Sequence, residues 1–354
     1  MSRDHAPLIP LATARRAAVR VLRALASSPD VLRLGVAGAL RRMEPRVPAV
    51  SLYATTLEPD AEAARRIERT VAELDFVQDG CLEPDLPFTL QVLPEADVGT
   101  ILAEPAPPAP GTLTMGDVRG AFHLHTTPGR GRYALARVAQ RATEEGYAWA
   151  VVTVPTAEAA ALDALRVEAE QVRAAARRAR EAAADDAPPP PPPVRLWFGL
   201  EAEPQPGGTL ALPADTGDLV LLRPSTSAQD TAAALSDPRV KVLAHPVEAD
   251  GAWYGRGADD VASWQHVLNA AAAHGVALEF SGAPRAAWLP DAVHALAREL
   301  GVPVLPGADA EALSDIDDLL CAVGPLRAHG WTPAEVLGTR TGDGFAAWLA
   351  AEDV

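Results

Sequence analysis

The stretch Ala121-Phe-His-Leu-His125 is a short apolar segment that ends in two histidines two residues apart. Side chains along a strand alternate between its two faces, so this spacing predicts a strand with both imidazoles on the same face. Six further apolar segments follow, separated by helical patterns, which is typical of a parallel sheet built from βα units. The predicted strands are 121–125, 148–154, 195–201, 218–222, 241–245, 276–280 and 302–305.

Seven βα units favour a closed barrel. An open sheet of this size usually carries a glycine-rich phosphate loop after its first strand, and this sequence has none there. The predicted fold class is therefore α/β, with a TIM-like (β/α)7 barrel. The predicted helices of the barrel are 133–145, 157–184, 261–274, 290–300 and 333–350.

A smaller α+β unit is predicted before the barrel, with helices at 11–26 and 58–74, strands at 31–36, 50–54 and 88–93, and a turn into a short element at 38–42. The segment Glu104-Pro-Ala-Pro-Pro-Ala-Pro-Gly111 is a stiff proline-rich connector. We therefore predict a first domain at 1–103, a linker at 104–117 and a barrel domain at 118–354.

The composition indicates a globular protein. Of the 354 residues, 48% are hydrophobic and 22% charged, and no apolar run is long enough to cross a bilayer, so we expect a cytoplasmic protein with no membrane segment. The formal net charge of -16 repels the phosphates of duplex DNA and argues against general binding to it. Cys81 and Cys321 are far apart, which excludes a disulfide framework and a thiolate zinc site.

Polar residues lie at the ends of several predicted strands. In a barrel of this kind the carboxyl ends of the strands meet on one face, where reactive residues gather. Two histidines and two carboxylates at that face suit zinc, manganese or iron. The alternative is a set of ordinary polar residues at strand–loop junctions. The candidates are His123, His125, Glu201, His245 and Asp309.

The segment Asp117-Val-Arg-Gly-Ala-Phe-His-Leu-His-Thr-Thr127 resembles the polymerase and histidinol phosphatase (PHP) domain as fused to bacterial family X DNA polymerases. The N-terminal segment Val36-Ala-Gly-Ala-Leu-Arg-Arg42 resembles the nucleotidyltransferase turn of the palm of those polymerases. The two matches cover nearly the whole chain in the same order, which implies a palm-like domain followed by a PHP barrel. The later strand ends fit too: GLE at 199–201, AHP at 244–246, LEF at 278–280 and ADA at 308–310.

The palm-like part departs from the family pattern. The carboxylates that hold two cations for phosphoryl transfer correspond here to Ala49, Ser51 and Thr89, and the usual serine of the turn is Ala39. The chain also leaves no room for fingers, thumb or lyase domains. We therefore expect a truncated, degenerate relative without polymerase activity, whose palm is a structural or interaction remnant.

The PHP part departs less. The resemblance implies up to three metal ions, and the ligands of the first site correspond to His123, His125, Glu201 and Asp309. The second site shares Glu201 and uses His245, whereas its remaining histidine corresponds to Pro224. We therefore expect one divalent ion, zinc or manganese. The third site has lost its ligands, with Arg130, Pro155 and Glu311 at the expected positions.

Three arginines form a second hypothesis. Arg130, with Arg132 or Arg223, places fixed positive charge where cations were lost, and so predicts a site for phosphate or a nucleic-acid end. The alternative is that these are solvated loop arginines. The other histidines on predicted helices, His266, His274, His294 and His329, are expected to be surface or packing residues.

Three functions follow from these residues. The first is a binding or regulatory module with one metal site, linked to DNA repair by kinship alone and with room for a protein partner. The second is a metal-dependent phosphoesterase, either a 3′-5′ exonuclease or a small-molecule phosphatase, with a reduced metal centre. The third is a structural protein whose histidine pair holds no metal.

Overall fold

The computed structural model describes residues 9–25, 28–41, 44, 46–56, 61–78, 81–82, 86–97, 111–127, 129–182, 191–246, 261–283 and 289–351. The chain divides into two compact units, Met1–Pro110 and Gly111–Val354. This division falls within the predicted linker 104–117, of which 104–110 lie outside the described residues.

The first unit is built around a five-stranded sheet. Helix α1 (Leu11–Leu25) packs against β4 and helix α3 (Ala61–Ala72) against β7, because each helix has apolar residues three or four positions apart on one face. A short helix, α2 (Gly38–Arg41), and a two-stranded sheet of β1 (Ile9–Pro10) and β3 (Arg46–Val47) complete it. The spatial order is β2 (Arg33–Val36), β4 (Val50–Thr56), β7 (Leu86–Pro94), β6 (Cys81–Leu82) and β5 (Val77–Gln78).

The second unit is an α/β barrel. Its seven strands are all parallel and stand side by side in chain order, as the succession of βα units predicts. They are β8 (Gly120–Leu124), β9 (Trp149–Pro155), β10 (Arg195–Ala202), β11 (Leu219–Leu222), β12 (Val240–Leu243), β13 (Ala277–Ser281) and β14 (Val304–Gly307).

The sheet curves until its first and last strands meet. The residues that follow β14 bond to β8: the Ala308 N–H donates to the Phe122 carbonyl at 2.9 Å, and the Ala310 N–H to that of His123 at 3.0 Å. The His125 N–H donates in return to the Ala310 carbonyl at 2.8 Å. This closure places Asp309 beside the two histidines of the first strand.

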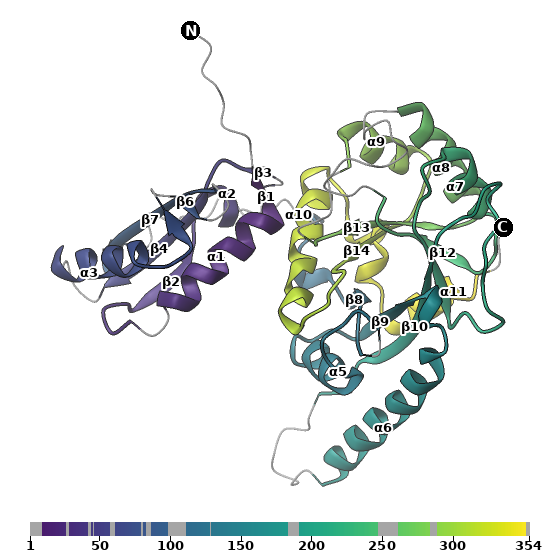
Figure 1. Ribbon diagram of the computed structural model, residues 1–354, viewed down its shortest axis with the longest axis horizontal. Coiled ribbons are helices and arrows are strands. Elements are labelled where there is room, and N and C mark those ends of the chain that lie inside the picture. Colours follow the sequence, from purple (N-terminus) through teal and green to yellow (C-terminus); the bar gives the residue numbers. More distant parts are fainter. Residues whose placement is uncertain are drawn as a thin grey trace. The chain divides into compact units, whose positions relative to one another are not determined.

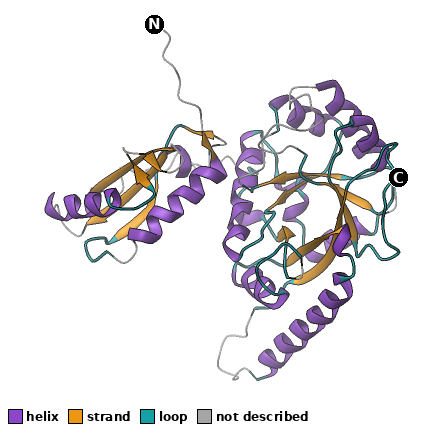
Figure 2. Cartoon of the chain, in the orientation of Figure 1, coloured by secondary structure: helices purple, strands orange, loops and turns teal. Residues whose placement is uncertain are grey.

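The helices surround the curved sheet, as Figures 1 and 2 show. They cover it because apolar residues on their inner faces pack against the outward side chains of the strands, such as Val152, Leu200 and Leu243. These helices are α5 (Leu135–Glu144), α6 (Ala161–Glu181), α7 (Ala228–Ala234), α8 (Val261–Ala273), α9 (Asp291–Glu299) and α10 (Leu319–Ala328). Helix α11 (Gly342–Leu349) packs instead against inward side chains of the strands.

The inward side chains change character along the strands. At the amino ends they form an apolar cluster in which Trp149 stacks on Phe345 of α11, with ring centroids 3.9 Å apart, and meets Trp197 edge-on. Four residues further along two of these strands, the inward positions are polar. They are Thr153 after Trp149, and Glu201 after Trp197.

The structure departs from the sequence prediction in three helical regions. The predicted helix 333–350 consists of two 3₁₀ turns, Pro333–Glu335 and Leu337–Thr339, followed by α11; Thr341 caps α11 by accepting a hydrogen bond from the Gly344 N–H. Helix α10 was not predicted because it is buried almost all round and shows no polar face. Helix α7 has only seven residues, too few for a periodic pattern.

Among the described residues, no helix combines the length and the apolar character that a membrane span requires.

Candidate metal centre

The carboxyl ends of the barrel strands bring the five predicted metal-ligand candidates together. His123 lies in β8 and His125 just after it, Glu201 lies in β10, and His245 and Asp309 follow β12 and β14. None of these five residues is more than 5% exposed. Five polar groups from four strands are thus buried at one end of the barrel.

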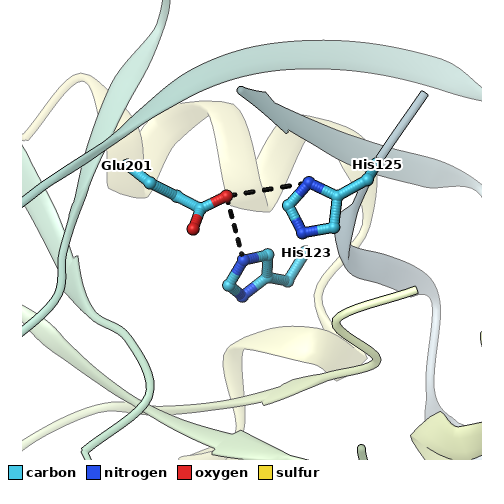
Figure 3. A group of neighbouring side chains, drawn as sticks. All are labelled: His123, His125 and Glu201. Atoms are coloured by element: carbon cyan, nitrogen blue, oxygen red, sulfur yellow. Dashed lines mark ion pairs between the residues drawn. The ribbon is translucent and has the colours of Figure 1, made fainter. Parts of the chain in front are cut away.

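Their side-chain atoms form two groups of three that could hold a metal ion. One group is His123, His125 and Glu201, drawn in Figure 3, and the other is His123, His245 and Asp309. Within each group the ligand atoms lie within 4.8 Å of one another. The structure thus groups His245 with Asp309, whereas the resemblance implied that it would share a site with Glu201.

Three of these residues have an unusual backbone. The φ angles of His123, His245 and Asp309 are 62°, 46° and 48°, in the left-handed region, which costs free energy for any residue other than glycine. In the described part of the chain they are the three non-glycine residues with positive φ. Backbone strain in this structure therefore coincides with one candidate metal group.

The two histidines of the first strand meet through an irregularity rather than a regular strand. The pairing of β8 with β9 shifts register between Ala121 and Leu124, and the left-handed His123 lies within that interval. The two imidazole centroids are 5.2 Å apart. Regular alternation of side chains along the strand, as predicted from the sequence, is therefore not the whole reason that both rings reach the site. The bulge at His123 is needed as well.

Glu279 of β13 orients two of the histidines. Its Oε1 lies 2.7 Å from His123 Nδ1, and its Oε2 accepts a hydrogen bond from the His245 N–H at 3.0 Å. Gly307 leaves room for this carboxylate, since a Cβ there would lie 2.0 Å from Oε1. A carboxylate on the far nitrogen of a metal-binding histidine fixes its ring and its tautomer.

The sequence motif LEF at 278–280 predicted no site role for Glu279. The signal that could have found it is its spacing of two residues from Ala277, which places its side chain on the inner face of the strand.

The two histidines offer nitrogen atoms to an ion. Nε2 of His123 and Nε2 of His245 are buried without a hydrogen-bond partner. They lie 3.9 Å and 3.8 Å from Oδ1 of Asp309. Two imidazole nitrogens and a carboxylate oxygen at these distances fit a zinc or manganese ion between them.

The electrostatics of the cluster favour a bound cation. Burial opposes the charge on His123, yet the carboxylates of Glu279 and Glu201 outweigh it and raise its pKa well above 6.5. Burial and the charge of His123 lower the pKa of His245 to about 4. Burial also opposes the charge of Glu201, but His123, His125 and Arg130 lower its pKa from 4.5. Without an ion, a proton on His123 supplies positive charge that a metal would replace.

Arg130 reaches into this cluster. Its Nη2 lies 2.8 Å and 3.0 Å from the two carboxylate oxygens of Glu201 and 2.9 Å from His125 Nε2. The other two predicted arginines have different surroundings: Arg132 is exposed, and Arg223 lies 3.6 Å from the carboxylate of Glu203. The phosphate hypothesis therefore rests on Arg130.

The palm-like positions also converge, but without carboxylates. Ser51 of β4 and Thr89 of β7 are partners on neighbouring parallel strands. The turn at Gly38, with φ 56°, packs beside Ser51, and the Ala37 N–H donates to the Ser51 carbonyl at 2.8 Å. The backbone thus brings these residues together, while their side chains offer no ligand for a hard cation.

No family model matches the chain. The chain is similar to the DNA polymerase/3'-5' exonuclease PolX of Bacillus subtilis (strain 168), with 24% identity over 258 residues, 68% of this chain and 42% of that protein. The match thus spans less than half of the length of the bacterial polymerase.

Among solved structures, the chain matches the crystal structure of histidinol phosphate phosphatase (HISK) from Lactococcus lactis subsp. lactis Il1403, complexed with zinc, L-histidinol and phosphate. The TM-score is 0.37 at 11% identity, over 60% of this chain and 94% of that one.

Proposed function

We propose that the barrel is a PHP-type module with one divalent metal ion, zinc or manganese, that binds the phosphoryl group of a phosphorylated ligand. The observation that carries this proposal is a set of buried polar atoms without a partner. Among the described residues six such atoms occur, and five belong to the carboxyl end of the barrel. These five are His123 Nε2, Thr126 Oγ1, Arg130 Nε, Glu158 Oε2 and His245 Nε2.

The ion would be held by His123, His245 and Asp309. Their atoms lie close enough to share one ion, and Glu279 holds His123 so that Nε2 remains for it. A bound divalent ion acts as a Lewis acid that polarises a phosphoryl oxygen.

Arg130 is the residue that would bind the phosphoryl group in this proposal. Its Nη2 is engaged with Glu201, but its buried Nε has no partner. An N–H on a fixed guanidinium suits an acidic oxygen of phosphate better than it suits a neutral ligand. Arg130 is also the exposed part of the site, with 26% of its side chain accessible to solvent.

The charge of the chain narrows the class of ligand. A net charge of -16 opposes long polyanions, whereas a small phosphorylated molecule or a single nucleic-acid end carries few charges. We place the first unit in this proposal as an inactive palm with a structural or protein-binding role. The absence of carboxylates at Ala49, Ser51 and Thr89 supports this part, and kinship alone supports a link to DNA repair.

A metal-dependent phosphoesterase is the second candidate function. Three protein ligands are the usual number in catalytic zinc sites, because a remaining coordination position is left for water or substrate. The group His123, His245 and Asp309 has this number. This candidate includes a 3′-5′ exonuclease and a small-molecule phosphatase.

Metal analysis of the purified protein tests the metal centre. We expect one equivalent of zinc or manganese in the unmodified protein and none in the double variant His123→Ala, His245→Ala. His266→Ala is the matched control, because His266 is an exposed histidine on α8. An unmodified protein that stays metal-free after dialysis against either ion would contradict the proposal.

Calorimetry with inorganic phosphate then tests ligand binding. We expect binding to protein loaded with one equivalent of metal, and binding at least tenfold weaker for Arg130→Ala at the same metal loading. Arg137→Ala serves as the control, because Arg137 is exposed on α5 and contacts Gln140. Equal affinity of Arg130→Ala and unmodified protein would remove Arg130 from the proposal. Turnover of p-nitrophenyl phosphate, bis(p-nitrophenyl) phosphate or a single-stranded oligonucleotide, abolished in the histidine variant, would favour the phosphoesterase.

A further inference from the structure

A single nitrogen atom of Arg130 lies among ligands that the sequence assigns to a metal ion. Nη2 is 2.8 Å and 3.0 Å from the oxygens of Glu201, 2.9 Å from His125 Nε2 and 3.8 Å from Asp309 Oδ1. Glu201, His125 and Asp309 are three of the four residues of the predicted first site. A positive group thus sits where those three side chains converge.

The contacts of His125 show why positive charge fits there. Its Nδ1 lies 3.2 Å from the Thr153 carbonyl, and its Nε2 lies 3.1 Å from Oδ1 of Asp309. With the carboxylate of Glu201, two buried acidic groups thus converge beside this ring. The guanidinium of Arg130 places positive charge between them, as a metal ion would.

The loop that carries Arg130 is fixed by the backbone of the site. At Gly131 a Cβ would lie 2.3 Å from the carbonyl carbon and oxygen of His125, so only glycine lets the loop pass this closely. The Arg132 N–H donates to the Glu311 carbonyl at 2.8 Å, which ties the loop to the segment after β14. The fold therefore directs the guanidinium into the cluster.

Two nitrogen atoms of the cluster face Asp309. Nε2 of His123 and Nε2 of His245 are buried without a hydrogen-bond partner and lie 3.9 Å and 3.8 Å from Asp309 Oδ1. His123 Nε2 also lies 3.5 Å from Glu201 Oε1, so it borders the place that Arg130 occupies. The contacts of Arg130 go to Glu201, His125 and Asp309. The cluster thus has two adjacent places for positive charge, and the guanidinium occupies one of them.

We infer that Arg130 is a built-in cation that replaces a second metal ion. The chain then binds one ion at His123, His245 and Asp309, and the place at Glu201 and His125 accepts a metal only when the guanidinium is removed. This inference rests on the proposed metal centre. The side chain at position 130 then determines how many metal ions the chain binds.

Metal stoichiometry in full-length variants tests this inference. Unmodified protein, Arg130→Gln, Arg130→Met, Arg130→Lys and the surface control Arg137→Gln are titrated with manganese and with zinc, and bound metal is measured after gel filtration. We expect one ion per chain in unmodified protein, Arg130→Lys and Arg137→Gln, and two in Arg130→Gln and Arg130→Met. Added manganese should also raise the melting temperature of the two neutral variants more than that of unmodified protein.

The outcomes separate this inference from the proposed function. One ion in unmodified protein and one in the neutral variants would overturn the role of Arg130 and leave the proposed metal centre intact. Two ions in unmodified protein would also overturn that role, because the second ion would then bind beside the guanidinium. No ion in any variant would overturn both. If the neutral variants fold only with metal, refolding in manganese decides: recovery with two ions supports the inference, and no recovery contradicts it.

Discussion

The two ends of the barrel use the same strands for opposite purposes. At the amino ends, Trp149 and Trp197 pack against Phe345 in an apolar cluster. At the carboxyl ends, the same inner face carries polar groups whose buried nitrogens lack partners and whose backbones lie in the left-handed region. One end stabilises the fold, whereas the other combines left-handed backbone with buried polar atoms that have no hydrogen-bond partner among the described residues.

The largest expected effect concerns the apolar end. Phe345→Ala should lower the free energy of unfolding by about 3–5 kcal/mol, because it removes a fully buried ring that stacks on Trp149. Tryptophan fluorescence during urea unfolding measures it, since all seven tryptophans lie in Gly111–Val354. Trp348→Ala, a half-buried residue of the same helix, should cost less. Equal losses would show that the stacking on Trp149 is not what stabilises this end.

The second prediction concerns how the polar end orients its ligands. Glu279→Gln should weaken metal binding by about 10–100-fold, because a glutamine amide has one acceptor oxygen and an N–H₂ that only donates, so it cannot accept from both the His123 ring and the His245 N–H. Competition with a fluorescent chelator gives the affinity. Glu299→Gln, at an exposed position on α9, is the control. An unchanged affinity in Glu279→Gln would separate this carboxylate from the metal centre.

The third prediction concerns His294. Among the residues that the structure describes, its Nε2 is the one buried side-chain polar atom outside the site without a hydrogen-bond partner. Its ring stacks on His329 with centroids 3.6 Å apart, and its Nδ1 accepts from Trp331. Burial and the charge of His329 lower its pKa to about 3. Between about pH 3 and 6.5, His294 is therefore protonated in the unfolded chain and neutral in the folded chain. The free energy of unfolding is then highest above pH 6.5 and falls as the pH is lowered through this range.

The measurement compares pH profiles of stability. In this window His294 should lower the free energy of unfolding by up to about 1.4 kcal/mol per pH unit. His294→Asn keeps an acceptor for Trp331 and should flatten that slope, while metal binding is unchanged. The comparison is between variants, since His329, Asp291 and Arg298 around this ring are present in both. A parallel slope in the variant would show that the burial of His294 does not control the acid response.

The smallest expected effect distinguishes strain from packing. His245→Asn should change the unfolding free energy of the metal-free protein by less than about 1 kcal/mol, because asparagine tolerates the left-handed φ of 46° and offsets the lost ring. Metal binding should be lost at the same time. Urea unfolding with and without manganese measures both. A loss comparable to that of Phe345→Ala would mean that His245 is a packing residue after all.

The first unit extends the comparison between backbone and side-chain chemistry. Ser51 and Thr89 lie opposite each other on adjacent parallel strands. The sheet needs only strand-forming side chains at these positions, so it forms without carboxylates.

The sequence was most informative where a periodic pattern repeats. The strand ending in His123-Leu-His125 and the apolar segments after it predicted all seven strands within a few residues, because a buried parallel strand needs a continuous apolar run. Helix α10 was not predicted, since burial on almost all sides leaves no polar face in its sequence pattern. The hairpin of β5 and β6 was not predicted because two-residue strands are too short to show a periodic pattern.

The amino-acid sequence by itself determined the α/β class, the strand order along the chain and the residue types available at the strand ends, because hydrophobic periodicity is a local property. Only the tertiary structure decided that His245 faces Asp309, that Glu279 holds two histidines and that Arg130 enters the cluster. These pairings join residues up to 184 positions apart, as between His125 and Asp309. Their geometry depends on barrel closure and on three left-handed backbones, which no local pattern encodes.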